Sequence, residues 1–119
     1  MAALVLAGCG GSSGHKALTV PAYGGFPSTT IAVTKGTPEY CRRDAEAFTR
    51  DAVAFLRPFP SDADVYRVQA RLQFIDFKAH LCDVAVLRKE FSRRLTAGQR
   101  RAVVQSFSFL GKTGRELSH

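Results

Sequence analysis

Apolar residues between Thr37 and Pro58 recur at every third or fourth position, which predicts an amphipathic helix over residues 38–57. Thr37 is a favourable N-cap, and Pro38 suits the first helical position because an N–H there would lack a helical partner. Pro58 ends the helix. The apolar stripe consists of Cys41, Ala45, Phe48, Ala52 and Phe55. Because the stripe is narrow, we expect it to pack against one partner helix.

A longer stretch, residues 62–94, carries two apolar stripes. Asp62 and Asp64 favour a helix start there, since acidic groups stabilise the N-terminal end of the helix dipole. The first stripe contains Val65, Val68, Leu72, Ile75, Ala79, Cys82 and Val86. The second stripe contains Phe74, Phe77, Leu81, Val84 and Phe91. Two stripes require two neighbours, so the pattern predicts one continuous, central helix.

A third helix is predicted over residues 97–110, because residues 96–99 (Thr-Ala-Gly-Gln) have the pattern of a capping box. Its apolar side consists of Val103, Val104, Phe107 and Leu110. Gly111 is a good C-terminal stop, and residues 112–119 are expected to be frayed. Together the three segments predict an all-α domain, a three-helix up-down bundle over residues 37–111.

The chain before the helices has the composition of a tether. Pro21, Pro27 and several glycines lie among Ser and Thr in this region, and these residues interrupt regular structure. We therefore expect residues 9–36 to form a flexible tether, with a short extended piece at residues 29–33.

The first nine residues read Met-Ala-Ala-Leu-Val-Leu-Ala-Gly-Cys. The last four, Leu6-Ala7-Gly8-Cys9, resemble the lipobox of bacterial lipoprotein signal peptides, in which a branched apolar residue and two small residues precede the modified cysteine. The resemblance covers only these positions and the Gly/Ser spacer at residues 10–14; no family is suggested for the helical domain. It implies that residues 1–8 are a truncated signal peptide that is removed. It also implies that Cys9 is acylated, for example with palmitate, and holds the protein on the extracytoplasmic face of the cell membrane.

This leader departs from the usual signal-peptide pattern in two respects. No Lys or Arg precedes Cys9, and the apolar run at residues 2–7 is short. We therefore expect translation to begin upstream of Met1. The alternative is an ordinary cytosolic N-terminus that contains Leu-Ala-Gly-Cys by chance.

The chain has three cysteines, Cys9, Cys41 and Cys82. If Cys9 carries lipid, the other two remain in an oxidising compartment, where a disulfide persists. Along two antiparallel helices Cys41 would lie about 24 Å, and Cys82 about 30 Å, from the proline-containing turn at residues 58–60. This near match predicts that Cys41 and Cys82 form a disulfide; the alternative is two buried, reduced thiols.

Positive charge is concentrated in the last third of the chain. The formal net charge is +7, and from Val86 onward eight Lys/Arg residues outnumber two acids, Glu90 and Glu116, which leaves +6 in this segment. Six of the basic residues surround the predicted turn between the second and third helices: Arg88, Lys89, Arg93, Arg94, Arg100 and Arg101. Such a patch attracts anionic partners, whether nucleic acid, phospholipid headgroups or cell-wall polymers, although it is also compatible with a solvated face.

Candidate catalytic chemistry is sparse. His80 shares a predicted helix face with Asp76 and Asp83, which makes a metal site or an acid–base pair conceivable. The same face continues through Gln69, Gln73 and Glu90 and avoids both apolar stripes, so we interpret it as a solvated polar face. The sequence has no nucleophile elbow and no phosphate-binding glycine loop. We therefore expect no metal, no cofactor and no enzymatic activity.

These observations favour a small, lipid-anchored, non-enzymatic helical protein that binds an envelope protein or an anionic envelope component. No apolar run approaches the roughly 18 residues that a spanning helix needs, so the lipid would be the anchor. The alternative is a cytosolic basic helical protein that binds nucleic acid through the third helix. The lipobox and the predicted disulfide argue against it. A third hypothesis is a carrier of a small ligand between the Phe-rich helices.

Overall fold

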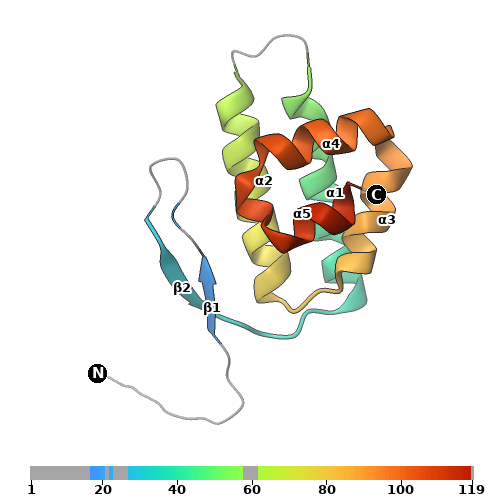
Figure 1. The fold of residues 1–119 in the computed structure, drawn as a ribbon. Coiled ribbons are helices and arrows are strands. Elements are labelled where there is room, and N and C mark those ends of the chain that lie inside the picture. The colour runs from blue at the N-terminus through green and yellow to red at the C-terminus, as the bar shows by residue number, and fades with distance from the viewer. Residues whose placement is uncertain (1–16, 21, 23–26, 58–61, 119) are drawn as a thin grey trace.

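The computed structural model describes residues 17–20, 22, 27–57 and 62–118. Within these ranges two short strands precede a helical domain, which confirms the predicted predominance of helix (Figure 1). In chain order the elements are β1 (Ala17–Val20), β2 (Thr29–Ala32), α1 (Pro38–Phe55), α2 (Ala63–Ala79), α3 (Val84–Arg94), α4 (Ala97–Ser106), the 3-10 helix η2 (Ser108–Leu110) and α5 (Lys112–Leu117). The described chain therefore has five α-helices where three were predicted.

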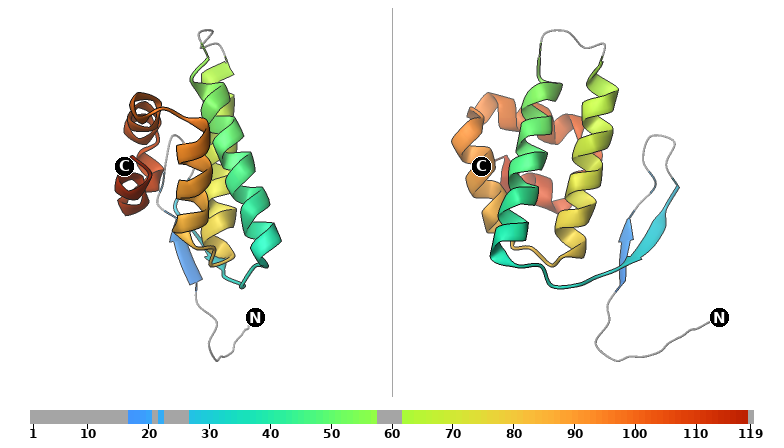
Figure 2. Two further views of the ribbon diagram at one scale, coloured as in Figure 1. Left: turned by 90° about the vertical axis from the view of Figure 1, so that its right-hand side faces the viewer. Right: turned by 180° about the vertical axis from the view of Figure 1, so that it is seen from behind.

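The helices form two layers (Figure 2). Helices α1 and α2 run antiparallel, and α3 packs beside α1, so these three make one layer. Helices α4 and α5 cross one face of the α1–α2 pair, and no described helix or strand covers the opposite face (Figure 2). Ala45 and Ala52 on α1 and Ala70 on α2 are fully buried, and side chains this small allow two helix backbones to approach closely.

The core is built around Phe48 of α1. Its ring lies 6.1 Å from that of Phe74, 5.9 Å from Phe91 and 6.1 Å from Phe107, measured between ring centroids. These separations are typical of favourable aromatic pairs, and each ring belongs to a different part of the helical domain. Phe48 therefore joins both layers, and its position on the predicted apolar stripe of α1 is confirmed.

The predicted continuous helix over residues 62–94 is wrong, because the chain breaks between α2 and α3. The N–H of Leu81 donates to the carbonyl of Lys78 at 3.0 Å, and the N–H of Cys82 donates to that of Phe77 at 3.2 Å. With Leu81 in the left-handed region (φ 54°), this is the Schellman end of a helix. Glycine usually fills that position, so a leucine there conceals the break. Asp83 then starts α3, and its side chain accepts a hydrogen bond from the N–H of Ala85 at 2.9 Å.

The buried residues of this segment also differ from the two predicted stripes. The buried stripe on α2 contains Ala70, Phe74 and Phe77, whereas Val65 and Leu72 of the first predicted stripe are each 54% exposed. Leu81, which was assigned to the second stripe, is 55% exposed. Helix α2 therefore has one strongly buried side, and the first predicted stripe is wrong over its N-terminal half.

The expectation of a frayed C-terminus at residues 112–119 is also wrong for the described residues. The predicted stop at Gly111 is real, since φ 55° and ψ −130° place it in a region that only glycine enters readily. The chain then forms α5, in which Thr113, Gly114 and Leu117 are buried. A β-carbon on Gly114 would lie 2.9 Å from Cγ1 of Val104, so α5 packs directly on α4.

Part of the predicted tether is ordered. Strands β1 and β2 pair antiparallel, with Ala17 opposite Ala32, which confirms extended structure near residues 29–33. Val20 is buried, and β1 contacts α2. The expectation of a flexible tether is therefore wrong for residues 17–20, which form β1, whereas residues 9–16 lie outside the described residues.

Candidate functional site

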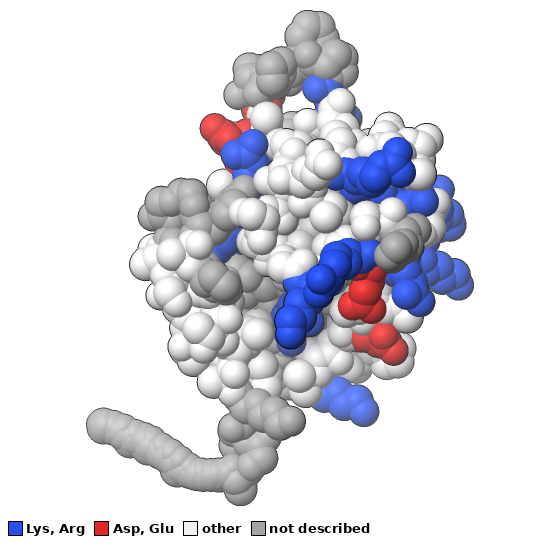
Figure 3. Space-filling view, viewed as in Figure 1, with Lys and Arg blue, Asp and Glu red and all other residues white. Residues whose placement is uncertain are grey.

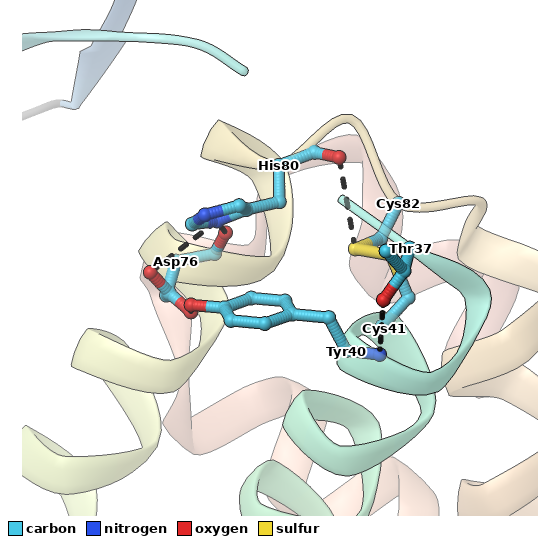
Figure 4. The surroundings of a disulfide bond; sticks show 6 residues. All are labelled: Thr37, Tyr40, Cys41, Asp76, His80 and Cys82. Atoms are coloured by element: carbon cyan, nitrogen blue, oxygen red, sulfur yellow. Dashed lines mark hydrogen bonds and ion pairs between the residues drawn. A yellow bond between two sulfur atoms is a disulfide. The ribbon is translucent and has the colours of Figure 1, made fainter. Parts of the chain in front are cut away.

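A disulfide joins Cys41 and Cys82, as predicted. The S–S distance is 2.03 Å and the two Cα atoms lie 5.5 Å apart (Figure 4). Cys41 lies in the first turn of α1, but Cys82 lies in the break between α2 and α3 and not on a helical stripe. The bond therefore fastens the C-terminal end of α2 to the N-terminal end of α1.

A group of polar side chains lies next to this disulfide. The hydroxyl of Tyr40 donates a 2.6 Å hydrogen bond to Oδ2 of Asp76, and its ring lies 4.2 Å from the ring of His80, between centroids (Figure 4). The Nδ1 atom of His80 lies 2.8 Å from the backbone carbonyl oxygen of Asp76 and 3.4 Å from its Oδ1. These contacts hold the tyrosine, the carboxylate and the imidazole together at one end of the α1–α2 pair.

Asp44 of α1 completes this group. We define the polar cluster as Asp44, Asp76 and His80 with the hydroxyl of Tyr40. Asp44 is only 9% exposed, and among the described residues no hydrogen-bond donor reaches its buried Oδ2. Burial, the hydrogen bond to Asp76 and the negative charge of Asp76 raise the pKa of Asp44 to about 8. Asp44 is therefore the member of the carboxyl pair that holds a proton near neutral pH.

The pKa values of Asp76 and Tyr40, which lie next to Asp44, shift in opposite directions. Burial alone would raise the pKa of Asp76. Hydrogen bonds from Asp44 and Tyr40 and the charge of His80 outweigh this effect, so the pKa of Asp76 is lowered. Asp76 is thus the ionised member of the pair. Its hydrogen bond raises the pKa of Tyr40 to about 12, with burial and the charges of Asp76 and Asp44 acting in the same sense.

The sequence interpretation identified part of this cluster and misassigned the rest. Asp76 and His80 do lie together, but Asp83 caps α3 through Ala85 and does not belong to the group. Asp44 was missed, although an acid one turn beyond Cys41 and adjacent to Ala45 on the apolar stripe is a signal of a buried polar residue. Its partner is far away in the sequence, so only the pairing of α1 with α2 reveals the cluster.

The basic residues of the last third gather on one side of the molecule. Lys and Arg side chains lie over α3 and over parts of α4 and α5, mainly on the right in this view (Figure 3). We define the basic surface as the eight Lys/Arg residues of these helices: Arg88, Lys89, Arg93, Arg94, Arg100, Arg101, Lys112 and Arg115. The structure thus extends the six predicted residues to the neighbouring α5.

Not all of this charge is free. Glu90 is buried and accepts from Arg93 at 2.9 Å, and it lies 3.5 Å from Arg94. Arg100 donates a 2.7 Å hydrogen bond to the carbonyl of Leu95. The other five basic residues, Arg88, Lys89, Arg101, Lys112 and Arg115, are exposed, and none of them forms an ion pair with an acid of the described chain.

An open, mainly apolar pocket of ≈ 530 Å³ lies between the β-hairpin and the helical domain. Its apolar lining comes from Leu18 and Val20 of β1, Phe74 and Ile75 of α2, and Phe109 of η2. The pocket lies beside the helices and not in the space between them where the carrier hypothesis placed a ligand.

The proposed lipidation motif, Leu6 to Cys9, lies outside the described residues. No helix in the described ranges combines the length and apolar character that crossing a membrane requires. Comparisons of the chain with protein-family models, with curated proteins and with solved structures find no match.

Proposed function

We propose that this chain is a small extracytoplasmic lipoprotein, anchored through Cys9 and not an enzyme, whose helical domain contacts an anionic component of the cell envelope. The observation that carries the proposal is the basic surface on α3, α4 and α5. It gathers eight Lys/Arg residues against two acids, Glu90 and Glu116. A surface of one sign attracts partners of the opposite sign and raises their rate of association.

The remaining parts of the chain give this surface a context. The lipobox resemblance of residues 6–9 supports a membrane anchor, and the Cys41–Cys82 disulfide supports an oxidising compartment. A lipid on Cys9 would keep the domain close to headgroups and other envelope polymers. Attraction between exposed charges then needs to be only modest, because the anchor supplies a high local concentration.

The ion pairs of Glu90 decide which basic residues matter most. Arg93 and Arg94 share the charge of one buried carboxylate, so part of their charge is neutralised. Arg88, Lys89 and Arg101 are exposed and have no such partner among the described residues. We therefore expect these three to supply the largest share of the attraction.

The test is binding of the full chain carrying Cys9→Ser, so that no acyl chain contributes. Vesicles containing anionic phospholipid, neutral vesicles and an anionic cell-wall polymer are offered separately over a series of salt concentrations. Binding to an anionic partner should weaken steeply with salt, since exposed charges are screened over about 10 Å at 0.1 M. The triple variant Arg88→Glu/Lys89→Glu/Arg101→Glu should lose this binding.

The matched control reverses three exposed basic residues elsewhere that form no ion pair with a described residue, Lys35→Glu/Arg50→Glu/Arg57→Glu. It changes the net charge equally but leaves the basic surface intact, so it should retain most of the binding. Equal losses in both variants would reduce the effect to net charge, and binding to duplex DNA alone would favour the cytosolic alternative.

The anchor is tested independently. Expressed from its natural start in a bacterial host, the protein should incorporate labelled palmitate, and Cys9→Ala should abolish the label. Recovery of unlabelled protein in the soluble cytosolic fraction would contradict the lipoprotein part of the proposal.

A further inference from the structure

The proposed function does not involve the polar cluster, which lies at the disulfide-linked end of α1 and α2. The cluster brings together three groups that are common metal ligands: two carboxylates and an imidazole. One ligand atom each from Asp44, Asp76 and His80 lies within 4.8 Å of the other two. A tetrahedral zinc site, with metal–ligand distances near 2.0–2.2 Å, places its ligand atoms about 3.4 Å apart. Small side-chain rotations would bring the three ligand atoms to the separations that a zinc ion requires.

The burial of Asp44, with an oxygen that no donor reaches, is a second observation that points to a ligand. As a residue, Asp44 is nine-tenths buried, and no hydrogen-bond donor of the described part of the chain reaches its Oδ2. A buried polar oxygen without a partner is costly, and a cation at this point would satisfy it. The neighbouring carboxylate of Asp76 offers no donor of its own, so the two carboxyl groups are compatible only with a proton or a cation between them.

We propose that Asp44, Asp76 and His80 form a binding site for a divalent first-row transition metal ion, and that Zn²⁺ fits it best. An imidazole with two carboxylates suits zinc, which accepts nitrogen and oxygen ligands in a four-coordinate site. Magnesium and calcium prefer more oxygen ligands than the cluster offers. Three protein ligands leave a fourth position for water or for a donor from a partner.

The surroundings of the three residues orient them as a metal site requires. The hydroxyl of Tyr40 donates to Asp76 Oδ2, which leaves the other oxygen of that carboxylate for the ion. The contact of His80 Nδ1 with the Asp76 carbonyl holds the imidazole ring in place. Hydrogen bonds of this kind, from a ligand to a group behind it, are regular features of metal sites.

The disulfide fixes the two sides of the site relative to each other. Asp44 lies one turn after Cys41 on α1, and His80 lies two residues before Cys82. The N–H of Gly36 also donates to the His80 carbonyl at 2.8 Å, so the residue is held from a second side. A β-carbon on Gly36 would lie 3.0 Å from that of His80, which shows how closely the two segments approach.

The experiment is a titration of the oxidised full chain carrying Cys9→Ser, which removes the remaining free thiol as a competing ligand. Zn²⁺ alone is the probe, in competition with a chromogenic chelator, and the melting temperature is recorded with and without the ion. We expect one Zn²⁺ per chain and a rise in melting temperature, because an ion that binds only the folded state stabilises it. Co²⁺ in place of Zn²⁺ should give the visible absorption of a low-symmetry, four-coordinate site.

Asp44→Asn and His80→Gln should each weaken Zn²⁺ binding by about tenfold or more, since even the groups behind metal ligands contribute 10–100-fold. Asp51→Asn is the matched control, because Asp51 is another partly buried acid on α1 whose pKa is raised by burial, and it lies outside the cluster. It should leave Zn²⁺ binding unchanged. Far-UV circular dichroism establishes that each variant is folded, and if Asp44→Asn does not fold, His80→Gln decides. Absence of stoichiometric Zn²⁺ binding to the parent chain, or equal affinity in the parent and His80→Gln, would overturn the proposal.

Discussion

The N–H of Cys82 donates a 3.2 Å hydrogen bond to the carbonyl of Phe77, and the chain passes between them through the left-handed conformation of Leu81 (φ 54°). A residue with a β-carbon pays roughly 1–2 kcal/mol for that conformation, whereas glycine adopts it readily. The side chain of Leu81 is more than half exposed, so removing it loses little burial.

Leu81→Gly should therefore raise the free energy of unfolding by about 1 kcal/mol. The measurement is chemical denaturation followed by circular dichroism. Leu72→Gly is the control, because Leu72 is equally exposed but lies inside α2, where glycine destabilises by about 1 kcal/mol relative to alanine. A loss of stability in Leu81→Gly would mean that the leucine side chain contributes more than its exposure suggests.

The polar cluster predicts a pH dependence of stability in the metal-free protein. The pKa of Asp44 is about 8 in the folded chain, with Tyr40, Asp76 and His80 around it, and 3.8 in an ordinary setting. Between these values the folded state holds a proton that the unfolded state has released, so the free energy of unfolding should fall as pH rises from about 4 to about 8. The contribution of this proton to stability is fully present below a pH of about 4 and is lost above a pH of about 8.

Asp44→Asn tests this dependence, because the amide cannot ionise and can still donate to Asp76. In the presence of a chelator, the variant should be more stable than the parent at pH 8 and should depend less on pH between 4 and 8. Glu116→Gln, which removes an exposed acid on α5, should follow the parent curve. Parallel curves for the parent and Asp44→Asn would show that Asp44 is ionised in the folded state.

The disulfide predicts a large effect of reduction. It closes a loop with a sequence separation of 41 residues, which corresponds to about 4 kcal/mol in the chain-entropy model. In a Cys9→Ser background, Cys41→Ser should lower the melting temperature as much as a reducing agent does, and a reducing agent should then have no further effect. Cys41→Ser/Cys82→Ser should match the single variant, because each loses the same bond. Non-reducing mass spectrometry that finds two free thiols after oxidative folding would contradict the pairing.

The close contact between α4 and α5 predicts opposite effects at two helical glycines. Gly114→Ala places a β-carbon 2.9 Å from Cγ1 of Val104, and such overpacking costs about 1–3 kcal/mol. In Gly98→Ala the new methyl group meets only Nη2 of Arg101, at 4.0 Å, so the better helix propensity of alanine should stabilise the protein. The two unfolding free energies, measured by urea denaturation, should move in opposite directions. Equal stabilisation of both would show that α5 can shift away from α4.

Local signals in the sequence predicted the ends of helices correctly where a residue type itself favours the start or the end of a helix. Thr37 caps α1 through Tyr40, and Thr96 and Gln99 form the predicted capping box. Neither glycine nor proline marks the break at Leu81, and its one local signal, the N-cap Asp83, was assigned instead to the polar face of a continuous helix. The polar cluster depends on the register between two helices, and a polar residue on one stripe does not reveal which residue it faces on the other.

The Cys41–Cys82 bond also affects how the chain transmits force. A pull between the N-terminal segment and the helices α3–α5 would pass from Cys41 to Cys82 through the sulfur atoms and bypass the intervening residues. At about 3.4 Å per residue, a sequence separation of 41 withholds about 140 Å of extensible chain from the load. Helices α1 and α2 would remain paired under tension that separates the rest, and a protease cut in the connection between them would leave both halves covalently attached.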